Sequence, residues 1–277
     1  MTKGGWGALV LAVGISGCHT PSALPSSPPV QTRIISLTPS LTEVLFALDV
    51  GPQVVGVTAN DHFPPEVEKL PEVGDLQLDS EALLALHPDL VIFDPALHRQ
   101  QLHQLQSLGL KLKPLPTQNL DDLEQSVLQL GQVLGRQQRA QQLVEQMRRR
   151  LQECRDRAAH LKHRPRALVE IWSDPLVVAG QGSYVTEIVE AVGFINVCKK
   201  TGYPQLNLEE VHRLNPEVLI LTHPIEQQLA RTPGWSSLEA VRRGRLVIVP
   251  EDWLVRPGPR VLQALDHLQS WLLGQGD

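Results

Sequence analysis

The sequence predicts an α/β protein with two lobes, each built on a parallel sheet, joined by one long spine helix and enclosing a ligand cleft between them. Residues 78–93, LDSEALLALHPDLVIF, recur as LNLEEVHRLNPEVLIL in residues 206–221, which indicates two similar units. Short apolar strands alternate with helices in both halves, as in parallel sheets with right-handed crossovers. A long polar helix separates the halves, and clefts between lobes are favoured ligand sites.

The first half begins with a strand and continues in strand–helix units. Ser40 and Glu43 have the spacing of a capping box, and Asp79 precedes an apolar run, so each indicates the start of a helix. Three prolines favour a loop over residues 58–73. The expected strands are 33–37, 54–57, 90–93 and 110–115, and the expected helices are 40–48, 79–86, 97–108 and 120–134.

Residues 136–162 form the predicted spine helix. They are rich in Gln, Arg, Leu and Ala and contain no Pro or Gly. A helix of this length spans ~40 Å, which is the size of a domain. A coiled-coil partner face is the alternative, but the heptads are irregular, which favours a rigid connection between two lobes.

The second half repeats the alternation. Gly180 and Gly182 indicate a tight turn before Ser183, which is placed to cap a helix. The same glycines begin a dinucleotide fingerprint, but Val185 stands where its third glycine belongs. The expected strands are 166–171, 218–221 and 246–249, and the expected helices are 183–192, 207–214, 235–242 and 259–273.

The N-terminus has the pattern of an export signal. Lys3 precedes an apolar run that is too short to span a membrane, and Ile15-Ser-Gly-Cys18 resembles a bacterial lipobox. We expect a signal peptide over residues 1–17, lipidation of Cys18 and a Pro/Ser-rich tether over 18–32. A generic signal peptide is the alternative. The lobes then cover 33–135 and 163–277, on either side of the spine helix.

Charge and cysteine content limit the function classes. The 277-residue chain has a formal net charge of −5, whereas nucleic-acid-binding proteins normally carry a basic face. We therefore expect no nucleic-acid partner, and we expect a monomer. Besides Cys18, the mature chain contains Cys154 and Cys198, and their spacing leaves open whether they form a disulfide.

Catalytic and metal-binding patterns are weak. The chain lacks G-x-S-x-G, H-E-x-x-H and P-loop motifs, so we predict no catalytic residue, no covalently bound cofactor and no resident metal site. His160 and His163 share a polar helix face, which a solvated surface explains. His62 and His98 are better placed, in a loop and at a helix start, but each is isolated in the sequence.

Glu81 and Glu209 occupy matching positions in the two repeated segments. Each lies two residues after a capping residue, Asp79 or Asn207, and therefore in the first turn of its helix. Interaction with the helix dipole explains an acid at either place, at about 0.3–1 kcal/mol. Matching acids in both lobes further indicate a two-point docking surface for basic residues of a pseudo-symmetric partner.

An ordered set of motifs extends from residue 34 to residue 260. It comprises the two repeated segments together with IISLTPSLTE at 34–43, VGV at 55–57, FPP at 63–65, GD at 74–75, EIWSDP at 170–175, AG at 179–180, YPQL at 203–206 and RPGPR at 256–260. Together these resemble the cobalamin/iron-siderophore class of ABC-transporter substrate-binding proteins. The resemblance implies two α/β lobes bridged by one long helix, a ligand held between them and delivery to a membrane permease.

The resemblance also implies functional residues. In this family one acid per lobe docks onto permease arginines, and Glu81 and Glu209 occupy those places. In a cobalamin-binding relative, aromatic side chains of both lobes pack on the corrin, whereas the matching N-terminal positions here are polar. The positions expected to contact ligand are Pro39, Asn60, Asp75, Asp94, Trp172, Tyr203, Trp253 and Arg256.

We therefore expect a non-enzymatic, exported, lipid-anchored protein that captures a metal chelate and delivers it to a permease dimer with its ATPase. Cobalamin or another corrinoid is the first candidate ligand, and a ferric siderophore or haem is the next. The anchor would lie in the periplasm of a diderm or on the outer face of a monoderm membrane. Two rivals stay open: a free zinc- or manganese-binding protein using Asp61, His62 and Asp94, and a chelate-remodelling enzyme.

Overall fold

The computed structural model describes residues 1, 32–75 and 77–274. The predicted signal peptide, the lipidation site at Cys18 and all of the tether except Thr32 lie outside the described residues, apart from Met1. Residues 32–277 form one compact unit. In the described part of the chain, no helix is both long and apolar enough to cross a membrane.

The first sheet has four strands in the order β2-β1-β3-β4, and every neighbouring pair is parallel. The order places the first strand inside the sheet, between β2 and β3. Its strands are β1 (Ile34–Ser36), β2 (Val54–Gly56), β3 (Leu90–Phe93) and β4 (Leu112–Pro114). Its helices are α1 (Pro39–Ala47), η1 (Gly51–Gln53), η2 (Pro65–Lys69), α2 (Ser80–Ala85), α3 (Leu102–Ser107) and α4 (Leu120–Val133).

The second sheet follows the order β6-β5-β8-β9, with β7 also paired to β5. The β5–β6 pair is antiparallel, so the prediction of a wholly parallel sheet is wrong for this edge. The chain reverses at Asp174 and Pro175, residue types that favour turns. Its strands are β5 (Arg166–Ser173), β6 (Leu176–Val178), β7 (Ile195–Asn196), β8 (Val218–Leu221) and β9 (Leu246–Ile248).

Among the residues that the structure describes, seven helical segments accompany the second sheet. Ser183 caps the first of them by accepting a hydrogen bond from the backbone N–H of Thr186, as predicted. The helix expected over 235–242 is instead two short pieces, because Leu238 adopts an extended conformation. The helices are α6 (Tyr184–Val192), α7 (Leu208–Leu214), α8 (Glu226–Arg231), η3 (Trp235–Ser237), α9 (Glu239–Arg242), α10 (Glu251–Leu254) and α11 (Val261–Gly274).

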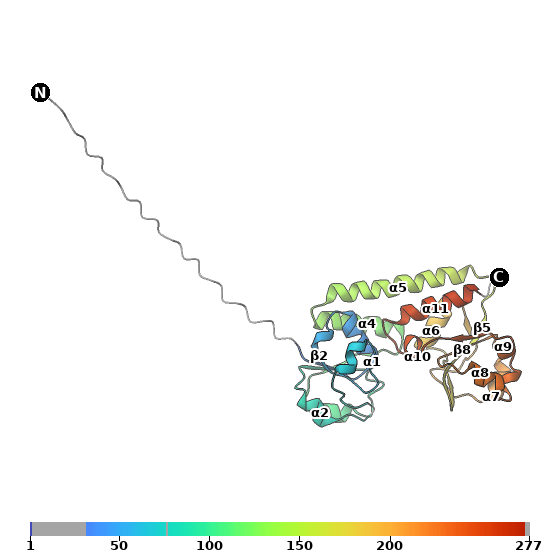
Figure 1. The fold of residues 1–277 in the computed structure, drawn as a ribbon, viewed down its shortest axis with the longest axis horizontal. Helices are drawn as coiled ribbons and strands as arrows, with labels where there is room; N and C mark the ends of the chain where they lie inside the picture. The colour runs from blue at the N-terminus through green and yellow to red at the C-terminus, as the bar shows by residue number, and fades with distance from the viewer. Residues whose placement is uncertain (2–31, 76, 275–277) are drawn as a thin grey trace. The chain divides into compact units, whose positions relative to one another are not determined.

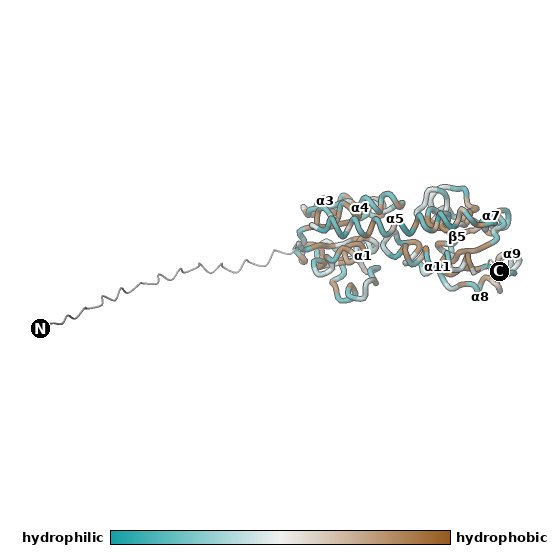
Figure 2. Tube along the Cα trace, turned by 90° about the horizontal axis from the view of Figure 1, so that it is seen from above, coloured by the Kyte–Doolittle hydropathy of each residue, from teal (hydrophilic) through white to brown (hydrophobic). Residues whose placement is uncertain are grey.

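Helix α5 (Gln137–Ala159) packs against α4 of the first half and against α6 and α11 of the second (Figures 1 and 2). Its buried positions, from Ala140 to Ala158, recur at intervals of three or four residues apart from the adjacent pair Leu143 and Val144, while the intervening positions are polar. The largest cluster of buried apolar side chains includes Leu45 of α1, Met147 of α5 and Ile188 of α6. One continuous core therefore joins both sheets through α5.

The structure corrects two local predictions and answers one question that the sequence leaves open. Thr38, not Ser40, is the N-cap residue of α1, and the side chain of Glu43 pairs with Arg260 instead of completing a capping box. The helix expected over 97–108 is reduced to α3, because the Asp94 carboxylate binds backbone N–H groups of the preceding turn. The two buried cysteines, Cys154 and Cys198, are not joined by a disulfide.

Candidate ligand-binding and docking sites

The loops at the carboxyl ends of the strands carry most of the predicted ligand contacts, and this is where α/β sheets bind ligands. In the first lobe, Asn60 lies exposed in the loop after β2. Asp75 is half-buried next to Gly74, and Pro39 is the first residue of α1 and half-buried. These side chains are polar or small and present no aromatic surface.

Asp94 begins the loop after β3 and is buried. Its Oδ1 accepts a hydrogen bond from the backbone N–H of Ala96 at 2.7 Å. Its Oδ2 accepts from the backbone N–H and the hydroxyl of Thr117, at 2.8 and 2.7 Å. Both carboxylate oxygens are therefore used within the lobe, where they tie the loop after β3 to the loop after β4.

Asp61 is a second buried acid at this edge. Its Oδ2 accepts hydrogen bonds from the backbone N–H and hydroxyl of Thr58, at 2.9 and 2.6 Å. Burial raises the pKa of Asp61 above its ordinary value, and the Thr58 hydrogen bonds oppose this shift. The carboxylates of Asp61 and Asp94 are therefore both buried and hydrogen-bonded within the first lobe.

The second lobe presents large aromatic side chains at the corresponding edge. Trp172, near the end of β5, is 51% exposed, and Tyr203 is 46% exposed. The indole Nε1 of Trp172 donates to the carbonyl of Asp174 at 2.9 Å, which fixes the ring orientation. Exposed aromatics that are held in place offer apolar surface for a ligand to bury.

His223 is a functional candidate that sequence reasoning missed. It lies two residues after β8, with its ring centroid 5.6 Å from that of Trp172 and nearly perpendicular to it. The sequence signal for it is a histidine two residues after the strand predicted over 218–221.

Trp253 and Arg256 lie differently from Trp172. Trp253 is half-buried, packs against the main core and has its ring edge-on to His267 of α11. Arg256 forms an ion pair with Asp252, with 3.0 Å between Nε and Oδ1. Trp253 therefore contributes to packing around α10 and α11 and does not form an exposed aromatic surface like that of Trp172. Arg256 is held on α10 by its ion pair.

A buried ion pair joins the two halves of the molecule. Arg260 Nε lies 2.9 Å from Glu43 Oε2, and its guanidinium stacks 4.4 Å above the ring of Phe63. Arg260 also reaches Asp252, with 3.4 Å between Nη1 and Oδ2. Burial raises the pKa of Glu43 despite the opposing effect of Arg260.

Glu81 and Glu209 are exposed second residues of α2 and α7. Asp79 and Asn207 cap the two helices through their side chains, as predicted. Figure 1 shows α2 and α7 on the side of the molecule opposite α5. The two acids therefore occupy equivalent positions on the same side of the protein.

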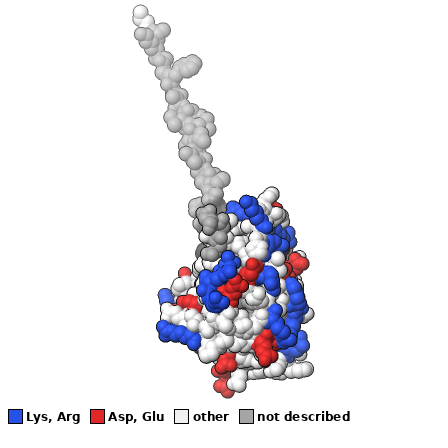
Figure 3. Space-filling model, turned by 90° about the vertical axis from the view of Figure 1, so that its right-hand side faces the viewer, with Lys and Arg blue, Asp and Glu red and all other residues white. Residues whose placement is uncertain are grey.

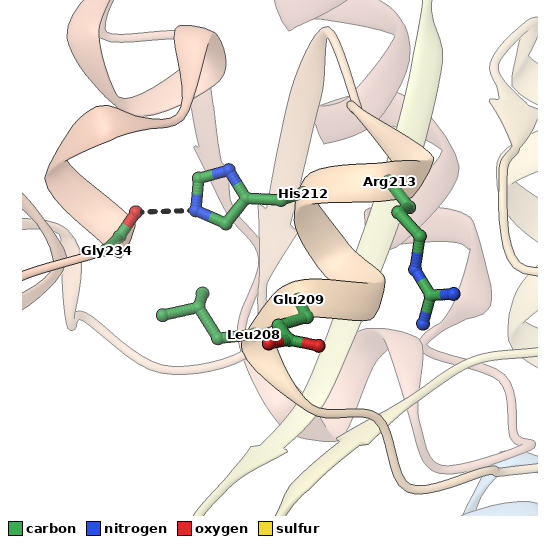
Figure 4. Close-up of a pocket in the computed structure, with 5 residues that line it drawn as sticks. All are labelled: Leu208, Glu209, His212, Arg213 and Gly234. Atoms are coloured by element: carbon green, nitrogen blue, oxygen red, sulfur yellow. Dashed lines mark hydrogen bonds between the residues drawn. The ribbon is translucent and has the colours of Figure 1, made fainter.

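The surface beside Glu209 contains a recess of ≈ 570 Å³ (Figure 4). Leu208, His212, Arg213 and Gly234 complete its lining. The Nε2 atom of His212 lies 2.9 Å from the carbonyl oxygen of Gly234, and this contact joins α7 to the turn before η3. Around this end of the molecule, Figure 3 shows acidic and basic side chains interleaved.

The histidines considered as metal ligands have different surroundings, and His160 and His163 lie beyond Ala159, the last residue of α5, and not on a shared helix face as predicted. His62 is exposed, whereas His98 is buried with Nδ1 3.0 Å from the carbonyl of Asp94. His160 and His163 are exposed, and His163 pairs with Glu217 at 3.0 Å. Within residues 32–75 and 77–274, no three His, Cys, Asp or Glu side chains come together as a metal site.

Comparisons with known proteins agree on one family. The family model "Periplasmic binding protein" matches residues 34–253. The chain is 28% identical to the uncharacterised ABC transporter substrate-binding lipoprotein YvrC of Bacillus subtilis, over 95% of this chain and 94% of that protein.

Two solved structures have the same fold. The periplasmic haem-binding protein RhuT of Roseiflexus sp. RS-1 matches with a TM-score of 0.79 and 30% identity, covering 89% of this chain and 100% of that one. The periplasmic vitamin B12-binding protein BtuF of Vibrio cholerae matches with a TM-score of 0.78 and 28% identity, covering 88% and 98%. The chain therefore belongs to the periplasmic binding protein family, the non-enzymatic substrate-binding proteins of ABC transporters.

Proposed function

We propose that this protein captures a metal chelate between its two lobes and delivers it to an ABC importer. The observation that carries the proposal is the exposed aromatic pair Trp172 and Tyr203 at the carboxyl edge of the second sheet. The binding of vitamin B12 by one relative and of haem by another supports a large chelate as the ligand. Cobalamin or another corrinoid, haem and ferric siderophores are the candidates.

The domain organisation follows from the same proposal. Residues 1–17 are a lipoprotein signal peptide, Cys18 carries the lipid and residues 18–32 are the tether that keeps the protein at the membrane surface. Lobes 33–135 and 163–277 enclose the chelate, and the spine helix 136–162 connects them. The single spine helix and the continuous core through α5 favour a small closing motion.

Docking on the permease is assigned to Glu81 and Glu209. Equivalent exposed carboxylates at two helix N-termini suit a partner with two-fold pseudo-symmetry and one basic residue per subunit. Asp79 and Asn207 hold the two first turns in place, so both acids are presented on rigid elements.

The proposal is tested by measuring uptake of the bound chelate with the double variant Glu81→Ala, Glu209→Ala and the cognate permease. We expect transport to be abolished while chelate affinity remains that of the wild type. Glu239→Ala, an exposed first-turn acid on α9, is the matched control and should transport normally. Normal uptake by the double variant would remove the docking assignment.

A further inference from the structure

Helices α2 and α7 match in their first turns and differ in their second turns. The repeated segments pair Leu84 and Ala85 of α2 with His212 and Arg213 of α7. All four side chains are exposed. An apolar surface on the first lobe is therefore replaced by two nitrogen-containing side chains on the second, one turn after the glutamate in each case.

His212 is held in place at the edge of the recess beside Glu209. A carbonyl oxygen only accepts hydrogen bonds, so the 2.9 Å contact with Gly234 places the proton on Nε2 of the imidazole. Gly234 has a φ of 87°, and a Cβ at this position would lie 2.3 Å from Cδ2 of Leu208. Glycine therefore allows the turn before η3 to approach α7 and fix the imidazole (Figure 4).

Glu209 and Arg213 carry opposite charges on one face of α7. They are four residues apart, which is about 6 Å along a helix axis. The same spacing on α9 closes into an ion pair, with 2.6 Å between Glu239 and Arg243. Within the described part of the chain, neither Glu209 nor Arg213 forms an ion pair, and Figure 4 shows their charged groups apart.

The recess is open and suits a protein partner better than a small molecule. Its charged side chains are exposed, and Leu208 and Gly234 are only half-buried. Sites for small molecules normally bury most of the ligand surface, which this lining does not allow. Interaction with the helix dipole explains a basic residue in the last turn of α7, but it does not explain an acid left unpaired one turn away.

The charge pattern defines the chemistry of the partner. The carboxylate of Glu209 accepts hydrogen bonds from a basic side chain, and the guanidinium of Arg213 can donate two parallel hydrogen bonds to a carboxylate. Leu208 supplies apolar surface between them. A complementary segment therefore carries one basic and one acidic side chain, separated by about one helical turn.

We propose that His212 and Arg213 form a docking contact specific to the second lobe, and that this contact binds an acidic side chain of the permease. The acid lies next to the basic residue that pairs with Glu209. On the first lobe, the same permease segment meets the apolar side chain of Leu84. The inference rests on the proposed function and adds that the two lobes dock through unequal contacts.

The test measures binding of the full chain to the purified cognate permease with its ATPase in nanodiscs. Arg213→Glu should weaken docking on the order of tenfold or more, because it places like charges together. The affinities for cyanocobalamin and haemin and the thermal unfolding should remain those of the wild type. Arg149→Glu, an exposed position on α5, makes the same change of charge on the opposite side of the molecule and should dock normally.

A second measurement identifies the acidic partner. Each outward-facing Asp or Glu of the permease is changed to Lys, and one of these changes should restore docking of Arg213→Glu. A purely structural effect on α7 would not be repaired in this way. Weakened docking that no reversal repairs would overturn the acidic partner.

The remaining outcomes separate this inference from the proposed function. Normal docking of Arg213→Glu, together with lost uptake in the double variant Glu81→Ala, Glu209→Ala, would overturn the second-lobe contact and leave the proposed function intact. Failure of the wild type to dock on the importer would overturn both.

Discussion

The two lobes are alike at the helices proposed to dock on the permease and different at the sheet edges proposed to bind the ligand. Helices α2 and α7 both begin with a side-chain cap and an exposed glutamate at the second position. At the carboxyl edges of the sheets, in contrast, the first lobe directs Asp94 inwards to its own loops, and the second exposes Trp172. The repeated segments thus form similar capped helices, while the loops at the carboxyl edges of the two sheets differ.

This difference has a physical basis. A helix N-terminus with a capping side chain needs only local residues, so a repeated segment reproduces it wherever it occurs. A loop at the carboxyl edge of a sheet depends on contacts with residues far away in the sequence, as the hydrogen bonds between Asp94 and Thr117 demonstrate. Such contacts change independently in each lobe, so the two faces can become chemically distinct.

The largest expected effect comes from the ion pair that joins the lobes. Arg260→Met should lower the free energy of unfolding by about 3–5 kcal/mol, because it leaves the buried Glu43 without its partner. Urea denaturation measures this change. The double variant Glu43→Leu, Arg260→Met should recover much of the loss, since no buried charge then remains unpaired. Loss of less than about 1 kcal/mol in Arg260→Met would show that the pair does not stabilise the junction.

The second largest expected effect is on ligand affinity, and it differs between the carboxyl edges of the two sheets. Trp172→Ala should weaken binding of the chelate by about 1–3 kcal/mol, because an exposed aromatic surface of the second lobe is removed. Asp94→Asn in the first lobe should lower stability and leave affinity nearly unchanged, because its oxygens are engaged by its own loops. Titration calorimetry and urea denaturation of both variants separate the two effects. Equal losses of affinity in the two variants would mean that both lobes contribute equally to binding of the chelate.

The smallest expected effect is a pH dependence of the free energy of unfolding, which arises from Asp61 of the first lobe. Burial raises the pKa of Asp61 in the folded protein, so the folded state holds a proton more tightly than the unfolded state. At pH values below the ordinary aspartate pKa, the proton on Asp61 stabilises the folded state. This stabilisation is lost as the pH rises through the raised pKa of the folded protein. Asp61→Asn should therefore gain stability relative to the wild type as the pH rises through this range.

Unfolding of Asp61→Asn and the wild type in urea, at several pH values from about 4 to about 7, measures the difference. Asp174→Asn, an exposed acid in the β5–β6 turn, serves as the control and should show no such trend. A stability difference between Asp61→Asn and the wild type that stays constant with pH would contradict the assignment.

Local signals predicted much of the fold, and long-range contacts account for what they missed. Asp79 and Ser183 cap their helices as expected, and the extent of α5 was predicted to within three residues at each end. Ser40 and Glu43 have capping-box spacing, yet Glu43 is drawn to Arg260, which lies near the other end of the chain. No local pattern reports such a partner.

The candidate site was predicted less completely than the fold. Trp172 and Tyr203 are exposed at the expected edge, but Trp253 packs on the core, because α11 places His267 against its ring. His223 was missed because its neighbours Glu170 of β5 and Glu251 of α10 are distant in the sequence and meet it only in the folded protein. Sequence spacing alone does not reveal an imidazole with carboxylates near both nitrogens.

The central claim is that the protein binds a metal chelate against the exposed aromatics of its second lobe. The most direct test is a titration of the tryptophan fluorescence of the purified protein with cyanocobalamin, a panel of ferric siderophores and haemin, corrected for ligand absorbance. The account predicts saturable submicromolar binding of one chelate class, with the fluorescence change lost in Trp172→Phe. Absence of binding to every chelate would contradict it.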